Sequence, residues 1–219
     1  MTGLQTGSWL QVNWGVYLVT DREMIADRSL EDLVVEAVKG GVGAVQLREK
    51  TLSTRAFIEA ARTLRKRLAP LGVPLIVNDR ADVAWAAQAD GVHLGQSDMP
   101  YHLARKLLGA NALIGVSVES FEQLEETEEW DLAYVALSPI YSTSTKTDTV
   151  TEWGSDGIRA ARSRTSHRLI GIGGLNGETA AAPLCSGLDG IAVISAICRA
   201  SDPRREAERL AKLVRECAR

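Results

Sequence analysis

The chain has 219 residues, of which 45% are hydrophobic and 24% are charged, and its net charge is −3 at pH 7. A chain of this length and composition forms an ordinary globular protein whose core needs no disulfide or metal for folding. The acidic balance excludes a general nucleic-acid-binding protein, and the lack of an apolar run of about 18 residues excludes a transmembrane helix.

Residues 1–15 are predicted to be a loosely ordered N-terminal extension. They lack the basic flank and the apolar stretch of a secretory signal. Trp9 and Trp14 lie in this segment and are expected to pack against the bottom of the fold.

Eight short apolar runs, rich in β-branched residues, follow at a steady spacing. They occupy residues 16–20, 44–47, 73–77, 91–94, 112–116, 132–137, 169–172 and 190–194. Each is a brief, mostly apolar run rather than an alternation of apolar and polar residues, which is typical of parallel strands that are buried on both faces.

Amphipathic segments separate these runs and predict helices. The segments are residues 30–39, 53–68, 81–89, 101–108, 120–128, 157–164 and 176–186, with a last helix at 203–218. The first of them ends at Gly40 and Gly41, a common stop signal for a helix.

Eight strand–helix units without a linker or a change in composition predict one α/β domain, a (β/α)8 TIM barrel over residues 16–219. The alternative is an open doubly wound sheet. That fold predicts a glycine-rich turn after the first strand, and residues 20–23 contain no glycine. The pattern therefore favours the closed barrel.

The three cysteines are odd in number and lack the spacing of metal ligands. Cys185, Cys198 and Cys217 are therefore predicted to be reduced, structural thiols in a cytoplasmic protein.

Charged side chains follow several of the predicted strands. Arg48 and Lys50 follow the second strand, Asp79 the third, Asp98 the fourth and Lys146 the sixth. Active sites of such barrels lie at the carboxyl ends of the strands. Helix capping explains a single Asp or Ser there, but not cations and carboxylates from neighbouring strands.

Asp79 and Asp98 follow adjacent strands and predict a Mg2+ site. Two oxygen ligands without a neighbouring His or Cys suit this ion, which keeps water and takes substrate phosphate oxygens at its other positions. In the alternative interpretation, Asp79 pairs with Arg80 or caps the helix that begins at Ala81, and Asp98 caps the helix before Tyr101.

The loops after strands seven and eight predict a phosphate site. Glycines at 171, 173 and 174 allow a ligand to approach the backbone, and Ile194 and Ser195 begin the following helix with unpaired backbone N–H groups. His93 is expected to pack or form hydrogen bonds beneath the pocket, and Trp85 and Trp153 are expected to pack.

The ordered motifs resemble those of the thiamine-phosphate synthase family over residues 17–197. They are YLVTD at 17–21, QLREK at 46–50, NDR at 78–80, DGVHLGQ at 90–96 with Asp98, GVS at 115–117, TSTK at 143–146, GIGG at 171–174 and AVISAI at 192–197. The chain departs from the family pattern at Glu119, Ser138 and Ser142, none of which removes a charge from the predicted site.

The resemblance implies a role for each matching residue. The pyrimidine diphosphate would be bound by Gln46, Leu47, Arg48, Glu49, Lys50, Asn78, Ser117 and Lys146, with Asn78 facing the aminopyrimidine. The thiazole phosphate would be bound by Thr143, Ser144, Thr145, Gly174, Ile194 and Ser195. Arg48, Lys50 and Lys146 would be catalytic, and Asp79 and Asp98 would hold one Mg2+ per subunit.

The resemblance also implies the reaction. The enzyme would condense 4-amino-2-methyl-5-(diphosphooxymethyl)pyrimidine with a thiazole ethyl phosphate, giving thiamine phosphate and diphosphate. Its partners would be these small molecules, and it would bind neither nucleic acid nor a membrane. The oligomeric state is left open, with a homo-oligomer as one option. Three alternatives stay open: a thiazole tautomerase or a catalytically silent barrel that binds thiamine intermediates, both of which would keep the phosphate site, and a sugar-phosphate isomerase or epimerase on the same fold.

Overall fold

The computed structural model describes residues 12–25, 27–142 and 152–217 as a closed barrel of eight parallel strands. The strands are β1 (Val16–Val19), β2 (Ala44–Leu47), β3 (Leu75–Asn78), β4 (Gly91–Leu94), β5 (Leu113–Val118), β6 (Tyr134–Leu137), β7 (Leu169–Ile172) and β8 (Gly190–Val193). β8 closes the ring on β1, with Val16 opposite Ile191. The TIM barrel that the sequence predicts is thus confirmed, with each strand within a few residues of its predicted position.

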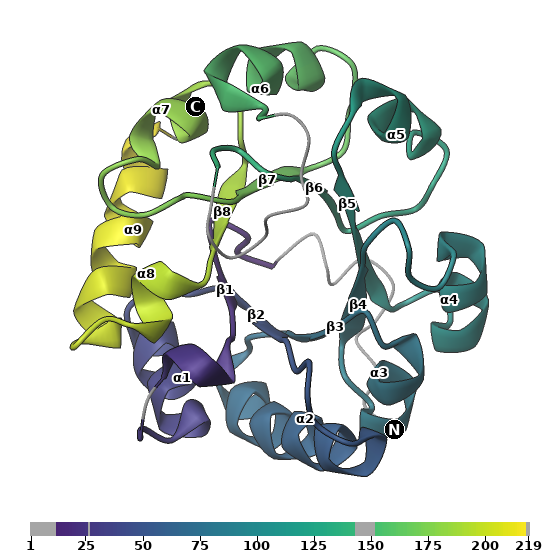
Figure 1. The fold of residues 1–219 in the computed structure, drawn as a ribbon, viewed down its shortest axis with the longest axis vertical. Coiled ribbons are helices and arrows are strands. Elements are labelled where there is room, and N and C mark those ends of the chain that lie inside the picture. Colours follow the sequence, from purple (N-terminus) through teal and green to yellow (C-terminus); the bar gives the residue numbers. More distant parts are fainter. Residues whose placement is uncertain (1–11, 26, 143–151, 218–219) are drawn as a thin grey trace.

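Helices form an outer layer around the strands (Figure 1). They are α1 (Leu30–Lys39), α2 (Thr54–Leu68), α3 (Ala81–Ala87), α4 (Tyr101–Leu108), α5 (Phe121–Glu126), α6 (Gly154–Arg162), α7 (Ala181–Cys185), α8 (Ser195–Cys198) and α9 (Pro203–Cys217). Short 3-10 helices lie at Arg22–Met24 and Ala69–Leu71.

The seventh helix is much shorter than the prediction of 176–186. The side chain of Asn176 accepts hydrogen bonds from the backbone N–H groups of Glu178 and Thr179, at 2.8 and 3.2 Å. Such local side-chain bonds stabilise a turn in place of a helix. The regular helix α7 therefore begins only at Ala181.

Two apolar cores follow from the alternation of side chains along each strand. One core fills the space between the barrel and the helices and includes Leu18, Val45 and Leu47. The other fills the barrel interior and includes Tyr17, Ile76, Tyr134 and Ile170 among its buried residues. Residues one position apart on a strand therefore belong to different layers.

The N-terminal end of the barrel is closed by Trp14, which is 2% exposed. Its ring lies 5.6 Å from that of Tyr17 and 4.6 Å from that of Tyr134, measured between centroids. The expected packing of Trp14 on the barrel bottom is confirmed, whereas Trp9 lies outside the described residues.

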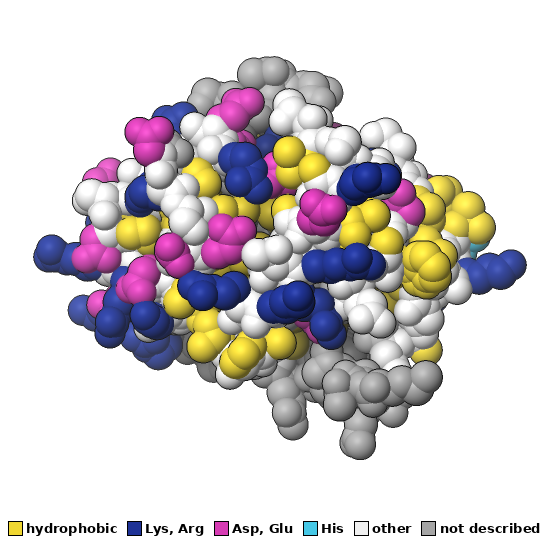
Figure 2. Space-filling model, turned by 90° about the horizontal axis from the view of Figure 1, so that it is seen from below, with side chains coloured by type: hydrophobic (Ala, Val, Ile, Leu, Met, Phe, Trp, Pro, Cys, Tyr) yellow, Lys and Arg dark blue, Asp and Glu magenta, His cyan; other side chains and the backbone are white. Residues whose placement is uncertain are grey.

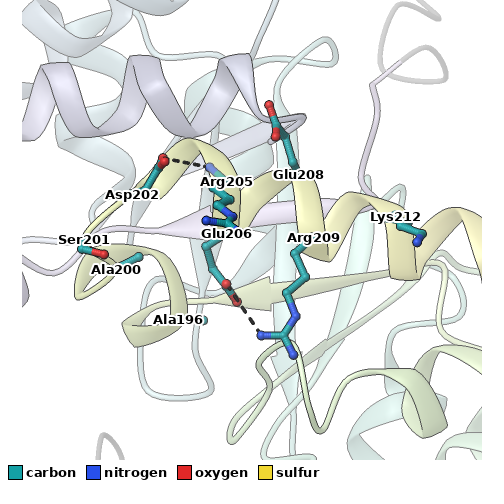
Figure 3. A pocket seen from close by; sticks show the side chains of 9 residues that line it. All are labelled: Ala196, Ala200, Ser201, Asp202, Arg205, Glu206, Glu208, Arg209 and Lys212. Carbon is teal, nitrogen blue, oxygen red and sulfur yellow. Dashed lines mark hydrogen bonds and ion pairs between the residues drawn. The ribbon is translucent and has the colours of Figure 1, made fainter.

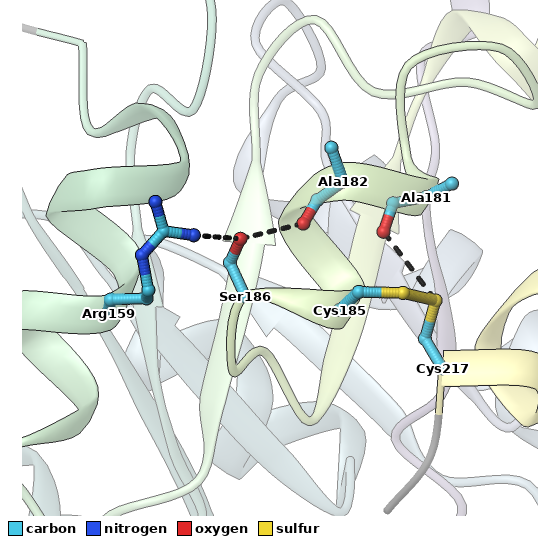
Figure 4. The surroundings of a disulfide bond; sticks show 6 residues. All are labelled: Arg159, Ala181, Ala182, Cys185, Ser186 and Cys217. Atoms are coloured by element: carbon cyan, nitrogen blue, oxygen red, sulfur yellow. Dashed lines mark hydrogen bonds between the residues drawn. A yellow bond between two sulfur atoms is a disulfide. The ribbon is translucent and has the colours of Figure 1, made fainter.

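The prediction of three reduced thiols is wrong for two of them. Cys185 at the end of α7 and Cys217 at the end of α9 form a disulfide (Figure 4). The two residues are 32 positions apart in sequence, and the barrel brings them together because α7 packs against α9. Cys198 is a buried thiol, as predicted.

The two tryptophans of the helical layer differ from each other. Trp153 is 7% exposed and packs edge-to-face against Phe121, as predicted. Trp85 on α3 is 63% exposed, so the expectation that it packs is wrong. Within the described ranges, no helix has the length and apolar character needed to span a bilayer.

Candidate active site

Two carboxylates meet above the carboxyl ends of β3 and β4. Asp79 directly follows β3, and its backbone N–H donates to the carbonyl of His93 at 2.8 Å. Its φ of +64° is rare for a residue other than glycine. The side chains of Asp79 and Asp98 are within hydrogen-bonding contact, and Asp98 Oδ2 also accepts from the backbone N–H of Gly95 at 2.6 Å.

The electrostatics of Asp79 show that cations gather at the same place. Burial raises the pKa of Asp79 to about 6, and the charge of Asp98 and the hydrogen bond with it act in the same direction. The positive charges of Lys50 and Arg48 oppose this rise of the pKa. The structure thus brings together four of the predicted site residues, which come from three consecutive strands.

The structure does not support the alternative interpretation of the two aspartates. Arg80 pairs with Asp82 rather than Asp79, with Nη2 and Oδ2 2.6 Å apart. α3 has no side-chain cap, and Pro100 is the N-cap residue of α4. Helix capping and pairing with Arg80 therefore do not account for Asp79 and Asp98.

The pair of aspartates fits a divalent cation. Two carboxylates in contact repel each other, and a bound cation removes that repulsion. No group of three or more His, Cys, Asp or Glu residues with metal-binding geometry occurs in the part of the chain that the structure describes. The donor set therefore suits Mg2+, which is commonly held by one or two carboxylates together with water and substrate phosphate.

Each charged residue after β2 except Lys50 has a partner after β1. Arg48 Nη1 lies 3.0 Å from Asp21 Oδ2, and Glu49 Oε1 lies 2.6 Å from Arg22 Nη2. The Glu49 side chain is only 3% exposed. The pairing of Asp21 with Arg48 and of Arg22 with Glu49 was not predicted from the sequence. Both residues follow the first strand, and the same position after a strand led to the prediction of Arg48 as a site residue.

Two predicted residues on β2 point in opposite directions. Gln46 is 4% exposed, and its amide faces the barrel interior, where it contacts Tyr17. Leu47 is fully buried in the core between barrel and helices. The Leu47 side chain therefore does not reach the mouth.

A chain of hydrogen bonds crosses the barrel interior beneath the mouth. Its members are Gln46 on β2, Tyr17 on β1, Tyr134 on β6, His93 on β4 and Ser117 on β5. The prediction that His93 forms hydrogen bonds below the pocket is confirmed. Sequence reasoning missed both tyrosines, although a Tyr within a buried strand usually needs a polar partner.

The loops after β7 and β8 form the opposite side of the mouth. Gly173 and Gly174 have φ values of +102° and +66°. A Cβ on Gly174 would lie 2.8 Å from the Cβ of Tyr141. Ile194 is the N-cap residue of α8, and Ser195, its first residue, is exposed. The predicted phosphate site thus offers backbone groups, and its glycines also allow the loop after β6 to pack closely.

The loop after β6 continues along β7 before it leaves the described residues. The N–H of Tyr141 donates to the carbonyl of Gly173 at 3.2 Å, and the N–H of Ser142 donates to Glu152 at 2.7 Å. The predicted residues Thr143, Ser144, Thr145 and Lys146 lie outside the described residues. The described residues on either side of this segment, Ser142 and Glu152, are joined by a hydrogen bond.

The outer surface carries a groove that is not part of this site. The groove has a volume of about 960 Å³ and runs along the start of α9, where Glu206 and Arg209 pair at 3.9 Å (Figure 3). No predicted site residue lines it. On the face seen in Figure 2, cationic and anionic side chains are interspersed, and no basic stripe is present there.

Comparison with known proteins identifies the family of the chain. A family model described as thiamine monophosphate synthase matches residues 16–197. The thiamine-phosphate synthase of Albidiferax ferrireducens is 49% identical over 199 residues, which cover 91% of each chain. That of Vibrio campbellii is 46% identical over 200 residues, covering 91% of this chain and 98% of the relative. The solved structure of a thiamine phosphate pyrophosphorylase from Pyrococcus furiosus superposes with a TM-score of 0.86 at 35% identity, covering 96% of this chain and 100% of the other.

Proposed function

This chain belongs to the thiamine monophosphate synthase family, and we propose how its barrel mouth carries out the reaction. The enzyme is a transferase that condenses 4-amino-2-methyl-5-(diphosphooxymethyl)pyrimidine with a thiazole ethyl phosphate, giving thiamine phosphate and diphosphate. The tautomerase alternative is not favoured, because the similar proteins of high coverage are synthases.

One observation carries the proposal for the site: the contact between Asp79 and Asp98 in the field of Arg48 and Lys50. We propose that the two aspartates hold Mg2+. When bound there, the ion neutralises charge on the diphosphate as it leaves. A sugar-phosphate isomerase is not favoured, because the similar proteins of high coverage are synthases.

Arg48, Lys50 and Lys146 would contact the diphosphate oxygens and stabilise the negative charge that develops on the bridging oxygen. The ion pair with Asp21 supports this role for Arg48, since the Arg48 side chain is 18% exposed and held in place at the mouth. Glu49 would act mainly through its pair with Arg22, which holds the loop after β2 beside the loop after β1.

Gln46, Asn78 and Ser117 would bind the pyrimidine ring. They lie on β2, β3 and β5, and all three belong to the set of alternating positions that faces the barrel axis. On the other side of the mouth, the thiazole phosphate would lie against Gly174, Ile194 and Ser195, with the thiazole ring near Thr143, Ser144 and Thr145.

The reaction breaks the bond between the pyrimidine CH2 carbon and the diphosphate oxygen, and it forms a bond from that carbon to the thiazole nitrogen. An aminopyrimidine stabilises positive charge on the CH2 carbon, so departure of diphosphate can precede attack. The thiazole nitrogen attacks with its lone pair, and no general base is required. The residues therefore have two tasks: to stabilise the leaving group and to hold the nucleophile in line.

A diphosphate-release assay tests this function. The enzyme is supplied with each substrate alone and with both, in the presence and absence of Mg2+. Release that needs both substrates and the metal supports the proposal. Release with the pyrimidine diphosphate alone, or no release under any condition, contradicts it.

We further propose that residues 16–219 belong to the catalytic barrel domain, since β1 begins at Val16 and pairs with β8 to close the barrel. We place the enzyme in the cytoplasm, where its phosphorylated substrates would be retained by their charge. Structural disulfides are uncommon in the cytoplasm, whereas Cys185 and Cys217 form one in the structure. Thiol labelling of intact cells tests this placement, because it shows whether the two cysteines are oxidised there.

A further inference from the structure

The hydrogen-bond chain inside the barrel joins two residues of the proposed pyrimidine site, Gln46 and Ser117, through three that have no role in the reaction described above. The three are Tyr17, Tyr134 and His93. Tyr17 is 1% exposed, Tyr134 is fully buried and His93 is 9% exposed. Buried polar groups of this kind are costly unless each is paired, so the order of donors and acceptors along the chain has consequences for its ends.

The order of donors and acceptors can be followed from one end to the other. Gln46 Nε2 donates to Tyr17 Oη at 2.9 Å. Either oxygen can donate in the contact between Tyr17 and Tyr134, 2.9 Å apart; because Tyr17 already accepts from Gln46, we assign its proton to this contact. Both ring nitrogens of His93 have partners, with Nδ1 2.8 Å from Tyr134 Oη and Nε2 2.9 Å from Ser117 Oγ, and their donor and acceptor roles depend on the tautomer. In the same assignment Tyr134 donates to Nδ1, and the tautomer with its proton on Nε2 donates to Ser117.

With this order, one end of the chain offers an acceptor to a ligand and the other end offers a donor. The amide nitrogen of Gln46 is used by Tyr17, so the carbonyl oxygen Oε1 is the group that the side chain can turn to a ligand as an acceptor. Ser117 Oγ accepts from His93, so its own proton can be donated to a ligand. The exocyclic amino group of an aminopyrimidine donates, and the ring nitrogen beside it accepts. The two ends of the chain match that edge.

The packing around the chain holds the two tyrosine side chains in place. Burial raises the pKa of both tyrosines, so each keeps its hydroxyl proton. Gly115 makes room for Tyr134, because a Cβ at that position would lie 2.0 Å from Cζ of the tyrosine ring. The Tyr17 and Tyr134 rings meet edge-to-face with centroids 5.5 Å apart.

We infer that Tyr17, Tyr134 and His93 are positioning residues that set the hydrogen-bond polarity of Gln46 and Ser117, and so select an amino over an oxo substituent on the pyrimidine. The inference rests on the proposed function, because it assigns the two ends of the chain to the pyrimidine. An oxo analogue presents an acceptor where the amino group presents a donor, and it would meet Gln46 Oε1 acceptor to acceptor. A site built on such bonds discriminates strongly against a ligand that cannot form them.

Tyr17→Phe is the most direct test, because it removes the hydroxyl that orients the Gln46 amide and keeps the ring. The probe is the 4-oxo analogue of the pyrimidine diphosphate, and the measured quantity is the ratio of its inhibition constant to the KM of the amino substrate. We expect Tyr17→Phe to lower this ratio by about tenfold, because the freed amide can rotate. The KM of the thiazole phosphate should stay unchanged.

Substitutions at the middle of the chain provide a second test. Tyr134→Phe and His93→Phe should each raise the KM of the pyrimidine diphosphate by about tenfold, the loss expected for a hydrogen bond in the binding site. His93→Gln retains one donor and one acceptor and should recover part of this loss. Tyr101→Phe is the matched control, because the Tyr101 hydroxyl contacts Asp131 on the outside of the barrel.

The outcomes separate this inference from the proposed function. A wild-type enzyme without Mg2+-dependent diphosphate release contradicts the proposed function before any variant is measured. An active wild type whose Tyr17→Phe variant keeps its amino-to-oxo ratio overturns the inference. An equal rise of KM for both substrates, without recovery in His93→Gln, also overturns it, because that pattern indicates a general structural role. If Tyr134→Phe does not fold, Tyr17→Phe still tests the inference.

Discussion

The two sides of the barrel mouth are built differently. On the side of β2 to β4, the groups that reach the mouth are charged side chains: Arg48, Lys50, Asp79 and Asp98. On the side of β7 and β8, the corresponding positions are the glycines 173 and 174 and the start of α8. In the proposed function, the first side holds a metal and a diphosphate through side-chain charge, whereas the second binds a phosphate through its backbone.

This difference separates the effects of substitutions. Where side chains carry the charge, truncation of one residue should remove most of an electrostatic contribution. Where backbone groups bind, truncation of a side chain should matter little, and the addition of one to a glycine should matter more. Four predictions test this contrast.

The largest effect is expected for Asp79→Ala. Removal of one carboxylate weakens the proposed hold on Mg2+ and with it the stabilisation of the leaving diphosphate, so kcat should fall by about 10²–10³-fold. Steady-state kinetics over a Mg2+ titration measure this. Asp82→Ala is the control, because Asp82 pairs with Arg80 on the surface of α3. Unchanged turnover in Asp79→Ala would refute the metal site.

Loss of the disulfide should destabilise the protein without affecting the charged side of the mouth. The Cys185–Cys217 link spans 32 residues, so Cys217→Ser should lower the free energy of unfolding by about 3 kcal/mol. Urea denaturation of the wild type and of Cys217→Ser, each with and without reductant, measures the free energy of unfolding. The Mg2+ concentration for half-maximal activity should not change, and a shift in it would show that the two sides are not independent.

Gly174→Ala should affect the phosphate side. At a φ of +66°, an added Cβ costs about 1–2 kcal/mol, and here it would also lie 2.8 Å from Tyr141. We expect the KM of the thiazole phosphate to rise about tenfold, a loss of about 1.4 kcal/mol of binding. Gly72→Ala is the control, since Gly72 has the same φ of +66° and a Cβ added there would have no neighbouring atom within 4 Å. A similar rise of KM in the control would assign the effect to backbone strain.

Ser195→Ala should have the smallest effect. If the backbone of α8 binds the phosphate, loss of the hydroxyl removes one hydrogen bond, worth about 0.5–1.5 kcal/mol. The KM of the thiazole phosphate should rise only a few-fold, with kcat unchanged. A fall in kcat as large as that of Asp79→Ala would contradict the division between the two sides.

The amino-acid sequence alone determined the barrel and the choice of charged residues. Both depend on local patterns: the buried strands are short, mostly apolar runs, and Arg48, Asp79 and Asp98 lie within four residues of the strand ends where parallel strands place functional groups. Helix boundaries were less predictable, because the Asn176 turn replaces helix through side-chain bonds that compete with the helical pattern.

Tertiary structure decided which residues are partners. Cys185 and Cys217 meet only because α7 and α9 are neighbours in the closed ring. Asp21 reaches Arg48 and Tyr17 reaches Tyr134 only because β1 pairs with both β2 and β8 and the interior side chains of separate strands meet on the barrel axis. The physical reason is that the pattern of a strand shows which of its side chains are buried. The side chain that each of them meets across the barrel depends on the register and closure of all eight strands.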